Sequence, residues 1–274
     1  MQQVEDNYYF DRMLKYGQCS RETGDYALAQ LVLEDLKTNY AGPHKIDSER
    51  EALLYDELGN TNFCRHDNDE AALNYRKALE LLSAQYYADH SKLTPVLDHM
   101  GELYLSQGNF EAAHSVCQKS LSIKEKSRLQ TSAETIESMR CCAIIEAYLG
   151  NYDVAHKMID KGIKLLEPTT MGPVEEFIYL KAKVLQMQEL YAEADAAYRE
   201  AIATFCKRLG RCHRLTKCLR DYIEFLTLTG KTEDAEKLKA HANNIDITNT
   251  GEVDTTLPHS TYYEKLRYPA TNLH

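Results

Sequence analysis

Apolar and small residues recur along this chain at intervals of three and four, which is the spacing of one face of an α-helix. One such run is formed by Leu97, Met100, Gly101 and Tyr104. The sequence GNFEAA follows from residue 108, and a second run continues at Ala113, Cys117 and Ser120. Two helical runs separated by a short turn predict a helical hairpin.

The turn of this hairpin recurs along the chain at a nearly constant interval. Its first residue is, in order, Gly24, His66, Gly108, Gly150, Glu189 and Gly230. The intervals between them are 42, 42, 42, 39 and 41 residues. A single hairpin cannot bury its apolar face alone, so a stacked neighbour must complete the core. The pattern therefore predicts an all-α solenoid of about six helix-turn-helix repeats.

The residues between the repeats suggest where each hairpin begins and ends. We expect the solenoid to occupy residues 1–244, with hairpins at about 10–40, 50–87, 93–128, 133–167, 173–208 and 213–244. Thr94 with Pro95 resembles an N-cap followed by proline at the first helical position, and Thr131 with Glu134 resembles a capping box. The periodicity stops beyond residue 244. We expect residues 245–274 to form a tail that is flexible, caps the last hairpin or fills a groove.

At these positions the sequence resembles the tetratricopeptide-repeat (TPR) family. The small residue of the family's first helix is matched by Gly17, Gly59, Gly101, Ala143 and Ala182. The alanine of its second helix is matched by Ala29, Ala71, Ala113, Ala155, Ala194 and Ala235. The period of about 42 residues resembles the longer subclass found in kinesin light chains. The resemblance implies a right-handed superhelix whose first helices line a concave groove.

Two repeats depart from the family pattern. His66 and Asn68 replace the turn glycine and aromatic of the second repeat, and Ile223 and Thr232 replace the small residue and the aromatic of the sixth. The carboxylate clamp of chaperone-binding relatives is also not reproduced. Its positions hold Leu14, Gln18, Glu57, Pro95 and His99, which lack the required cations and asparagines.

Composition and charge narrow the class of protein. Helix-favouring residues dominate, while the 274 residues include only 12 Gly and 6 Pro. The formal net charge of −10 argues against nonspecific nucleic-acid binding. No stretch approaches the apolar length of a membrane span, and the eight cysteines form no CxxC pair. We expect a cytoplasmic protein with reduced thiols, without a membrane or nucleic-acid partner.

The chain carries no motif that is typical of catalysis or cofactor binding. The sequence has no phosphate loop, zinc-protease helix or nucleophile elbow. Cys206, Cys212, His213 and Cys218 lie close in sequence, but their spacing distributes them over different helix faces, so ordinary thiols are favoured over a zinc site. We therefore expect no enzyme activity, no metal and no cofactor.

The concave groove implied by the TPR resemblance is the remaining candidate site. Its positions on the first helices are Asp56, Asn60, Phe63, Asp98, Glu102, Arg140, Tyr179, Lys183, Lys217, Arg220 and Glu224. This groove would be acidic in the early repeats and basic in the late ones. We expect an adaptor that binds a protein or peptide segment there. The alternatives are a self-assembling solenoid, which would form a homo-oligomer, and a regulatory subunit of a separately encoded enzyme.

Overall fold

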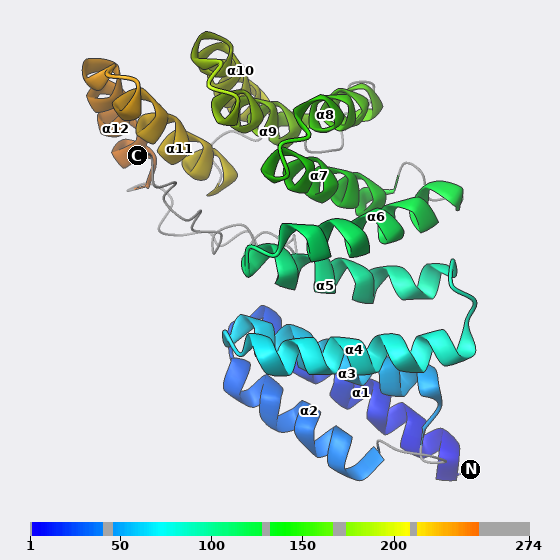
Figure 1. The fold of residues 1–274 in the computed structure, drawn as a ribbon. Helices are drawn as coiled ribbons and strands as arrows, with labels where there is room; N and C mark the ends of the chain where they lie inside the picture. The colour runs from blue at the N-terminus through cyan, green and yellow to red at the C-terminus, as the bar shows by residue number, and fades with distance from the viewer. Residues whose placement is uncertain (1, 41–45, 128–131, 167–173, 209–212, 247–274) are drawn as a thin grey trace. The chain divides into compact units, whose positions relative to one another are not determined.

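The computed structural model describes residues 2–40, 46–127, 132–166, 174–208 and 213–246. Within these ranges the chain forms twelve α-helices, one 3-10 turn and no strand. The expected tail at 245–274 lies almost wholly outside the described residues, as do Thr131 and Cys212. The chain divides into two compact units, Met1–Gln130 and Thr131–His274, each built from three helical hairpins. Figure 1 shows the helices in chain order.

The helices of unit 1 pair as consecutive hairpins. They are α1 (Gln2–Glu22) with α2 (Tyr26–Tyr40), α3 (Ser48–Cys64) with α4 (Asn68–Gln85), and α5 (Thr94–Ser106) with α6 (Phe110–Lys126). The 3-10 turn η1 (Ser91–Leu93) precedes α5. Each hairpin also contacts the next one, because α2 packs on α3 and α4 packs on α5.

Unit 2 follows the same order. Its hairpins are α7 (Ala133–Tyr148) with α8 (Tyr152–Leu166), α9 (Val174–Met187) with α10 (Tyr191–Arg208), and α11 (His213–Leu228) with α12 (Thr232–Asp246). Here α8 packs on α9 and α10 packs on α11. The prediction of an all-α repeat solenoid is thus confirmed. We call α1, α3, α5, α7, α9 and α11 the first helices.

Small residues allow the two helices of a hairpin to cross closely. A Cβ atom placed on Gly17 would lie 2.8 Å from Leu33 Cδ2 on α2. A Cβ atom on Gly59 would overlap the ring of Tyr75, and one on Gly101 would overlap Cys117 Sγ. Side chains of the second helix therefore fill the space that these glycines leave open.

The six turns share a left-handed residue, whether or not that residue is glycine. Gly24, Gly108, Gly150 and Gly230 have φ between 71° and 86°. His66 and Glu189 occupy the same place with φ of 66° and 61°. A side chain in this conformation is strained, so the turn geometry is imposed by the helices on both sides.

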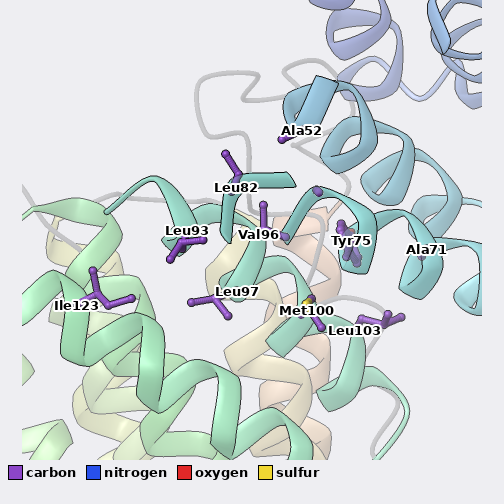
Figure 2. Close-up of a cluster of buried hydrophobic side chains, with 11 residues drawn as sticks. Ala52, Ala71, Tyr75, Leu82, Leu93, Val96, Leu97, Met100, Leu103 and Ile123 are labelled. Atoms are coloured by element: carbon purple, nitrogen blue, oxygen red, sulfur yellow. The ribbon is translucent and has the colours of Figure 1, made fainter. Parts of the chain in front are cut away.

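The hydrophobic core of unit 1 runs between successive hairpins. One cluster joins Phe10 and Leu14 of α1 to Leu33 and Leu36 of α2 and Leu58 of α3. A second cluster joins α3 and α4 to α5 and α6. Its buried side chains include Tyr75, Leu93, Leu97, Met100 and Ile123 (Figure 2). Every hairpin of this unit thus completes the apolar face of its neighbour.

Two predicted helix starts differ from the structure by one residue. Thr94 is the first residue of α5 rather than its N-cap, since η1 runs directly into the helix, while Pro95 does lie in the first turn. The N-cap of α7 is Ser132, whose Oγ accepts a hydrogen bond of 3.2 Å from the amide of Thr135. Serine and threonine are almost equivalent caps, so adjacent candidates are hard to distinguish in the sequence.

Candidate functional site

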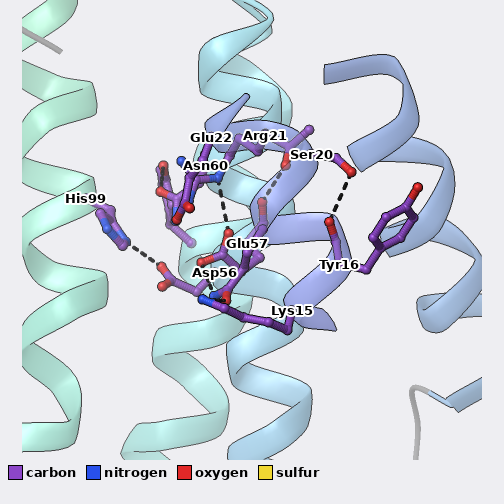
Figure 3. A network of polar contacts seen from close by, with 12 residues as sticks. Lys15, Tyr16, Ser20, Arg21, Glu22, Asp56, Glu57, Asn60 and His99 are labelled. Atoms are coloured by element: carbon purple, nitrogen blue, oxygen red, sulfur yellow. Dashed lines mark hydrogen bonds and ion pairs between the residues drawn. The ribbon is translucent and has the colours of Figure 1, made fainter. Parts of the chain in front are cut away.

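In unit 1, polar side chains connect each first helix to the next. Asp56 on α3 and His99 on α5 form an ion pair, with 2.8 Å between Oδ1 and Nδ1. Glu57 on α3 accepts a hydrogen bond from Gln18 Nε2 at 2.8 Å and pairs with Arg21 Nε at 3.2 Å. Figure 3 shows both connections on one side of these helices. Asp56 is therefore a bridging group between helices.

The charge of the His99 side chain depends on the carboxylates around it. Burial by itself lowers the pKa of His99, but the adjacent carboxylate of Asp56 outweighs it, with help from Glu102 and Glu57, and raises the pKa to about 9. The imidazole is thus a cation at neutral pH. Its ring also stacks on Tyr75, with 5.8 Å between ring centroids.

The other candidates in unit 1 have different surroundings. Asn60 is only 9% exposed, and its Oδ1 accepts a hydrogen bond of 2.9 Å from the hydroxyl of Tyr75. Asp98 is directed to its own second helix, where it pairs with Lys124 and accepts a hydrogen bond of 2.6 Å from Ser120. Phe63 packs at the edge of the core, and Glu102 is half-buried. Unit 1 brings Asp56 and Glu102 together around His99 but does not gather all five side chains into one open surface.

In unit 2 the first helices bring several candidate residues together. Arg140 on α7 pairs with Glu176 on α9 at 3.3 Å and with Glu137 on its own helix. Lys183 on α9 pairs with Asp221 on α11 at 3.1 Å. The hydroxyl of Tyr179 also donates a hydrogen bond to Asp221. Three successive first helices, α7, α9 and α11, are thus joined by side chains of opposite charge.

Lys217 on α11 lies in the field of this network. Burial has the largest effect and lowers the pKa of Lys217 to about 8. Among the neighbouring charges, Asp221 raises it most, Arg140 and Lys183 lower it, and Glu176 raises it. Loss of solvation on burial is therefore the main reason why folding disfavours the charged form of Lys217. Arg220 and Glu224, also on α11, are exposed to solvent.

Sequence reasoning missed the partners that hold this network together. Glu57, His99 and Asp221 each lie two positions before the small-residue position of their helix, which is Gly59, Gly101 and Ile223. A polar residue at this position contacts the preceding first helix in three repeats. Cys141 and Leu180 occupy it in the fourth and fifth repeats, where the bridge between α7 and α9 instead uses Glu176. The polar residue two positions before the small residue could therefore have been recognised from the repeat register.

Neither a metal cluster nor a membrane-spanning helix is found in the part of the chain that the structure describes. No group of three or more His, Cys, Asp or Glu is arranged there to hold a metal ion. No described helix has the length and apolar character needed to cross a membrane. Cys206 is exposed and Cys218 is buried, so these two thiols differ in environment.

The repeats of this chain are similar to those of known proteins. Residues 49–126 match the tetratricopeptide repeat family model. The chain is 32% identical over 151 residues to Protein KINESIN LIGHT CHAIN-RELATED 1 of Arabidopsis thaliana, an alignment covering 53% of this chain. The aligned part spans about a quarter of that relative, 24% of its length.

Solved structures share the fold at low sequence identity. The kinesin light chain nearly identical TPR-like repeats of Podosopora anserina superpose with a TM-score of 0.65 and 13% identity, covering 73% of this chain and 95% of theirs. A Rap protein complexed with competence and sporulation factor has a TM-score of 0.64 and 15% identity, covering 78% of this chain and 58% of its own. The family match over residues 49–126, the plant relative and the shared fold confirm the predicted resemblance to tetratricopeptide-repeat proteins of the kinesin light chain type.

Proposed function

We propose that this chain is a non-catalytic adaptor and that the first-helix face of unit 2 binds an acidic segment of a partner protein. The proposed contact residues are Arg140, Tyr179, Lys183, Lys217, Arg220 and Glu224. The main support is the convergence of three cations, Arg140, Lys183 and Lys217, from three successive first helices. Stacked helical repeats commonly use such a surface to bind extended segments.

The carboxylates of unit 2 suggest how a partner would be recognised. Glu176 and Asp221 hold Arg140 and Lys183 in fixed positions. Burial is the main cause of the lowered pKa of Lys217, so its ammonium group lacks much of the solvation that it would have in water. A carboxylate from a partner would supply a counter-charge to this poorly solvated ammonium group. The Rap protein complexed with a factor is a fold-level precedent for ligand binding by stacked helical hairpins.

Unit 1 has a different role in this proposal. Its candidate residues Asp56 and Asn60 are buried and hydrogen-bonded to neighbouring helices. We assign them to holding the repeats in register, and we assign segment binding in this unit only to its more accessible Phe63 and Glu102. Asp98 supports its own hairpin through Lys124.

Fluorescent peptides of about ten residues that differ only in the number of glutamates would test the proposal. Affinity for the full chain should increase with glutamate number. It should fall when the ionic strength rises from about 0.05 M to about 0.3 M, because exposed charges are then screened. The double variant Lys183→Gln/Arg220→Glu should lose this preference. Lys157→Gln/Lys164→Glu is the matched control, since both lysines are exposed on α8 and the change in net charge is the same. Equal affinity for all peptides would refute the proposal.

A further inference from the structure

Two leucines and a tyrosine are exposed at the turns of the fifth and sixth hairpins. Leu190 and Tyr191 lie where α10 begins, and Leu228 is the last residue of α11. Their exposed fractions are 42%, 49% and 69%. The ring centroid of Tyr191 lies 6.2 Å from that of Phe225, which is about one helical turn before Leu228. The three side chains therefore share one edge of unit 2, and we call them the α10–α11 edge patch.

Leu190 stands at a position where the first three repeats have a helix-capping residue. The equivalent residues are Asp25, Asp67 and Asn109, whose side-chain oxygens accept hydrogen bonds of 3.0, 3.4 and 3.2 Å from amides of the following helix. Leucine has no acceptor atom, so α10 lacks the side-chain cap of these three helices. Folding of the hairpin alone gives no reason for an exposed leucine here, whereas contact with an apolar segment does.

The α10–α11 edge patch is accompanied by carboxylates. Glu189 directly precedes Leu190, Asp234 lies in the first turn of α12, and both side chains are exposed. Lys231, which follows the turn between α11 and α12, already pairs with Asp195 at 3.5 Å. A segment that covers the patch should therefore combine apolar side chains with positive charge.

We propose that residues 260–269 of this chain, which lie outside the described residues, bind the α10–α11 edge patch. Their sequence is STYYEKLRYP. Its apolar side chains are Tyr262, Tyr263, Leu266 and Tyr268, and its basic side chains are Lys265 and Arg267. This segment thus carries both properties that the patch and its carboxylates require.

The connecting chain is long enough for this contact. The patch lies at the edge where α12 begins, so the connection must return along the length of α12. The 15 residues of this helix measure about 22 Å. Residues 247–259 precede the proposed segment, and a chain of this length can span about 40 Å. The covalent tether also raises the effective concentration of the segment, which allows a small patch to bind it. This contact does not depend on the proposed binding of an acidic partner.

Hydroxyl-radical footprinting of the full chain tests the contact, with a synthetic peptide of residues 258–272 as the unbound reference. We expect Tyr262, Tyr263 and Tyr268 to be oxidised about fivefold more slowly in the chain than in the peptide, because the tether keeps the segment bound. This protection should be independent of protein concentration. Oxidation at the rate of the peptide would overturn the proposal. Protection that grows with concentration would also overturn it, since the segment would then bind another molecule.

Replacing the two leucines separates the contact from folding. Leu190→Asn supplies a side-chain cap of the kind found at Asn109, so Leu190→Asn/Leu228→Asn should not lower the unfolding midpoint. The same double variant should raise oxidation of residues 260–269 to the rate of the peptide. Leu31→Asn/Leu73→Asn is the matched control, because both leucines are exposed on second helices of unit 1. Protection that survives in Leu190→Asn/Leu228→Asn would contradict the proposed contact.

Charge reversal tests whether the basic side chains meet the carboxylates of the patch. Glu189→Lys/Asp234→Lys should release the segment and increase its oxidation. Adding Lys265→Glu/Arg267→Glu should restore the protection, because the charges are again complementary. If the fourfold variant is oxidised as fast as the peptide, these charges do not meet and the assignment of the segment to this patch is wrong.

Discussion

Asp56 on α3 and His99 on α5 form an ion pair between two successive repeats, with 2.8 Å between Oδ1 and Nδ1. The His99 side chain is 17% exposed and that of Asp56 is 7% exposed, so solvent screens the pair only weakly. The pair links the hairpin formed by α3 and α4 to the hairpin formed by α5 and α6. Its protonation is therefore coupled to the stability of unit 1.

The first prediction concerns pH. The pKa of His99 is about 9 in the folded chain and 6.5 in a model peptide, so folding favours the protonated form. The stabilisation is complete below pH 6.5 and is lost as the pH rises through 9. We expect a loss of roughly 3 kcal/mol over this range. Asp56→Asn should lower the His99 pKa and abolish most of this dependence.

Two measurements separate this effect from other titrating groups. NMR titration should assign a pKa near 9 to His99, with His99→Gln identifying its resonance. Denaturant unfolding of wild type and Asp56→Asn should differ most at pH 6.5 and least above pH 9. Asp69→Asn, at an exposed position of α4, is the matched control. A His99 resonance that titrates near 6.5 would contradict the prediction.

The second prediction concerns the helix crossings. Gly101→Ala should destabilise the chain by about 1 to 3 kcal/mol, because the new Cβ overlaps Cys117 Sγ. The second substitution Cys117→Ala removes the obstructing sulfur. The double variant should therefore be more stable than the two single losses added together. Strict additivity in denaturant unfolding would mean that the two residues do not share this crossing.

These crossings show how much of the fold could be predicted from sequence. Gly59 and Gly101 recur 42 residues apart within a helical pattern, so hairpin order and register could be inferred from local spacing alone. The candidate site was harder to predict, because hydrogen bonds join residues from different repeats. Asp56 and Asp98 hold the same repeat position, yet Asp56 pairs with the next hairpin and Asp98 with Lys124 of its own. The partner with which each aspartate pairs depends on side chains about 26 or 43 residues away in the sequence. The repeat pattern does not specify these side chains.

The third prediction concerns the two turns that lack glycine. His66 and Glu189 have φ of 66° and 61°, a conformation that costs a side chain about 1 kcal/mol or more. His66→Gly and Glu189→Gly should each stabilise the chain by about 1 kcal/mol in thermal or denaturant unfolding. Gly108→Ala, at the equivalent turn with φ of 71°, should have the opposite sign. A destabilising His66→Gly would show that its side chain makes compensating contacts.

The fourth prediction links stability to binding at Lys217. Its pKa is about 8 in the folded chain and 10.5 in a model peptide, so folding disfavours the charged form. This cost is complete below pH 8 and disappears as the pH rises through 10.5. Lys217→Met keeps the length of the side chain and removes the charge. It should stabilise the chain by roughly 1 kcal/mol at pH 7, and the gain should vanish near pH 11.

The same substitution should weaken binding of the glutamate-rich peptides, because a bound carboxylate would compensate the Lys217 ammonium group for the solvation that it loses on burial. Wild type should also take up a fraction of a proton on binding at pH 8.5, and Lys217→Met should not. Calorimetry in two buffers of different ionisation enthalpy measures this uptake. Lys207→Met, at an exposed position of α10, is the control for simple loss of charge. If Lys217→Met gains stability and still binds acidic peptides with unchanged affinity and proton uptake, Lys217 is a strained structural residue and the acidic segment binds elsewhere.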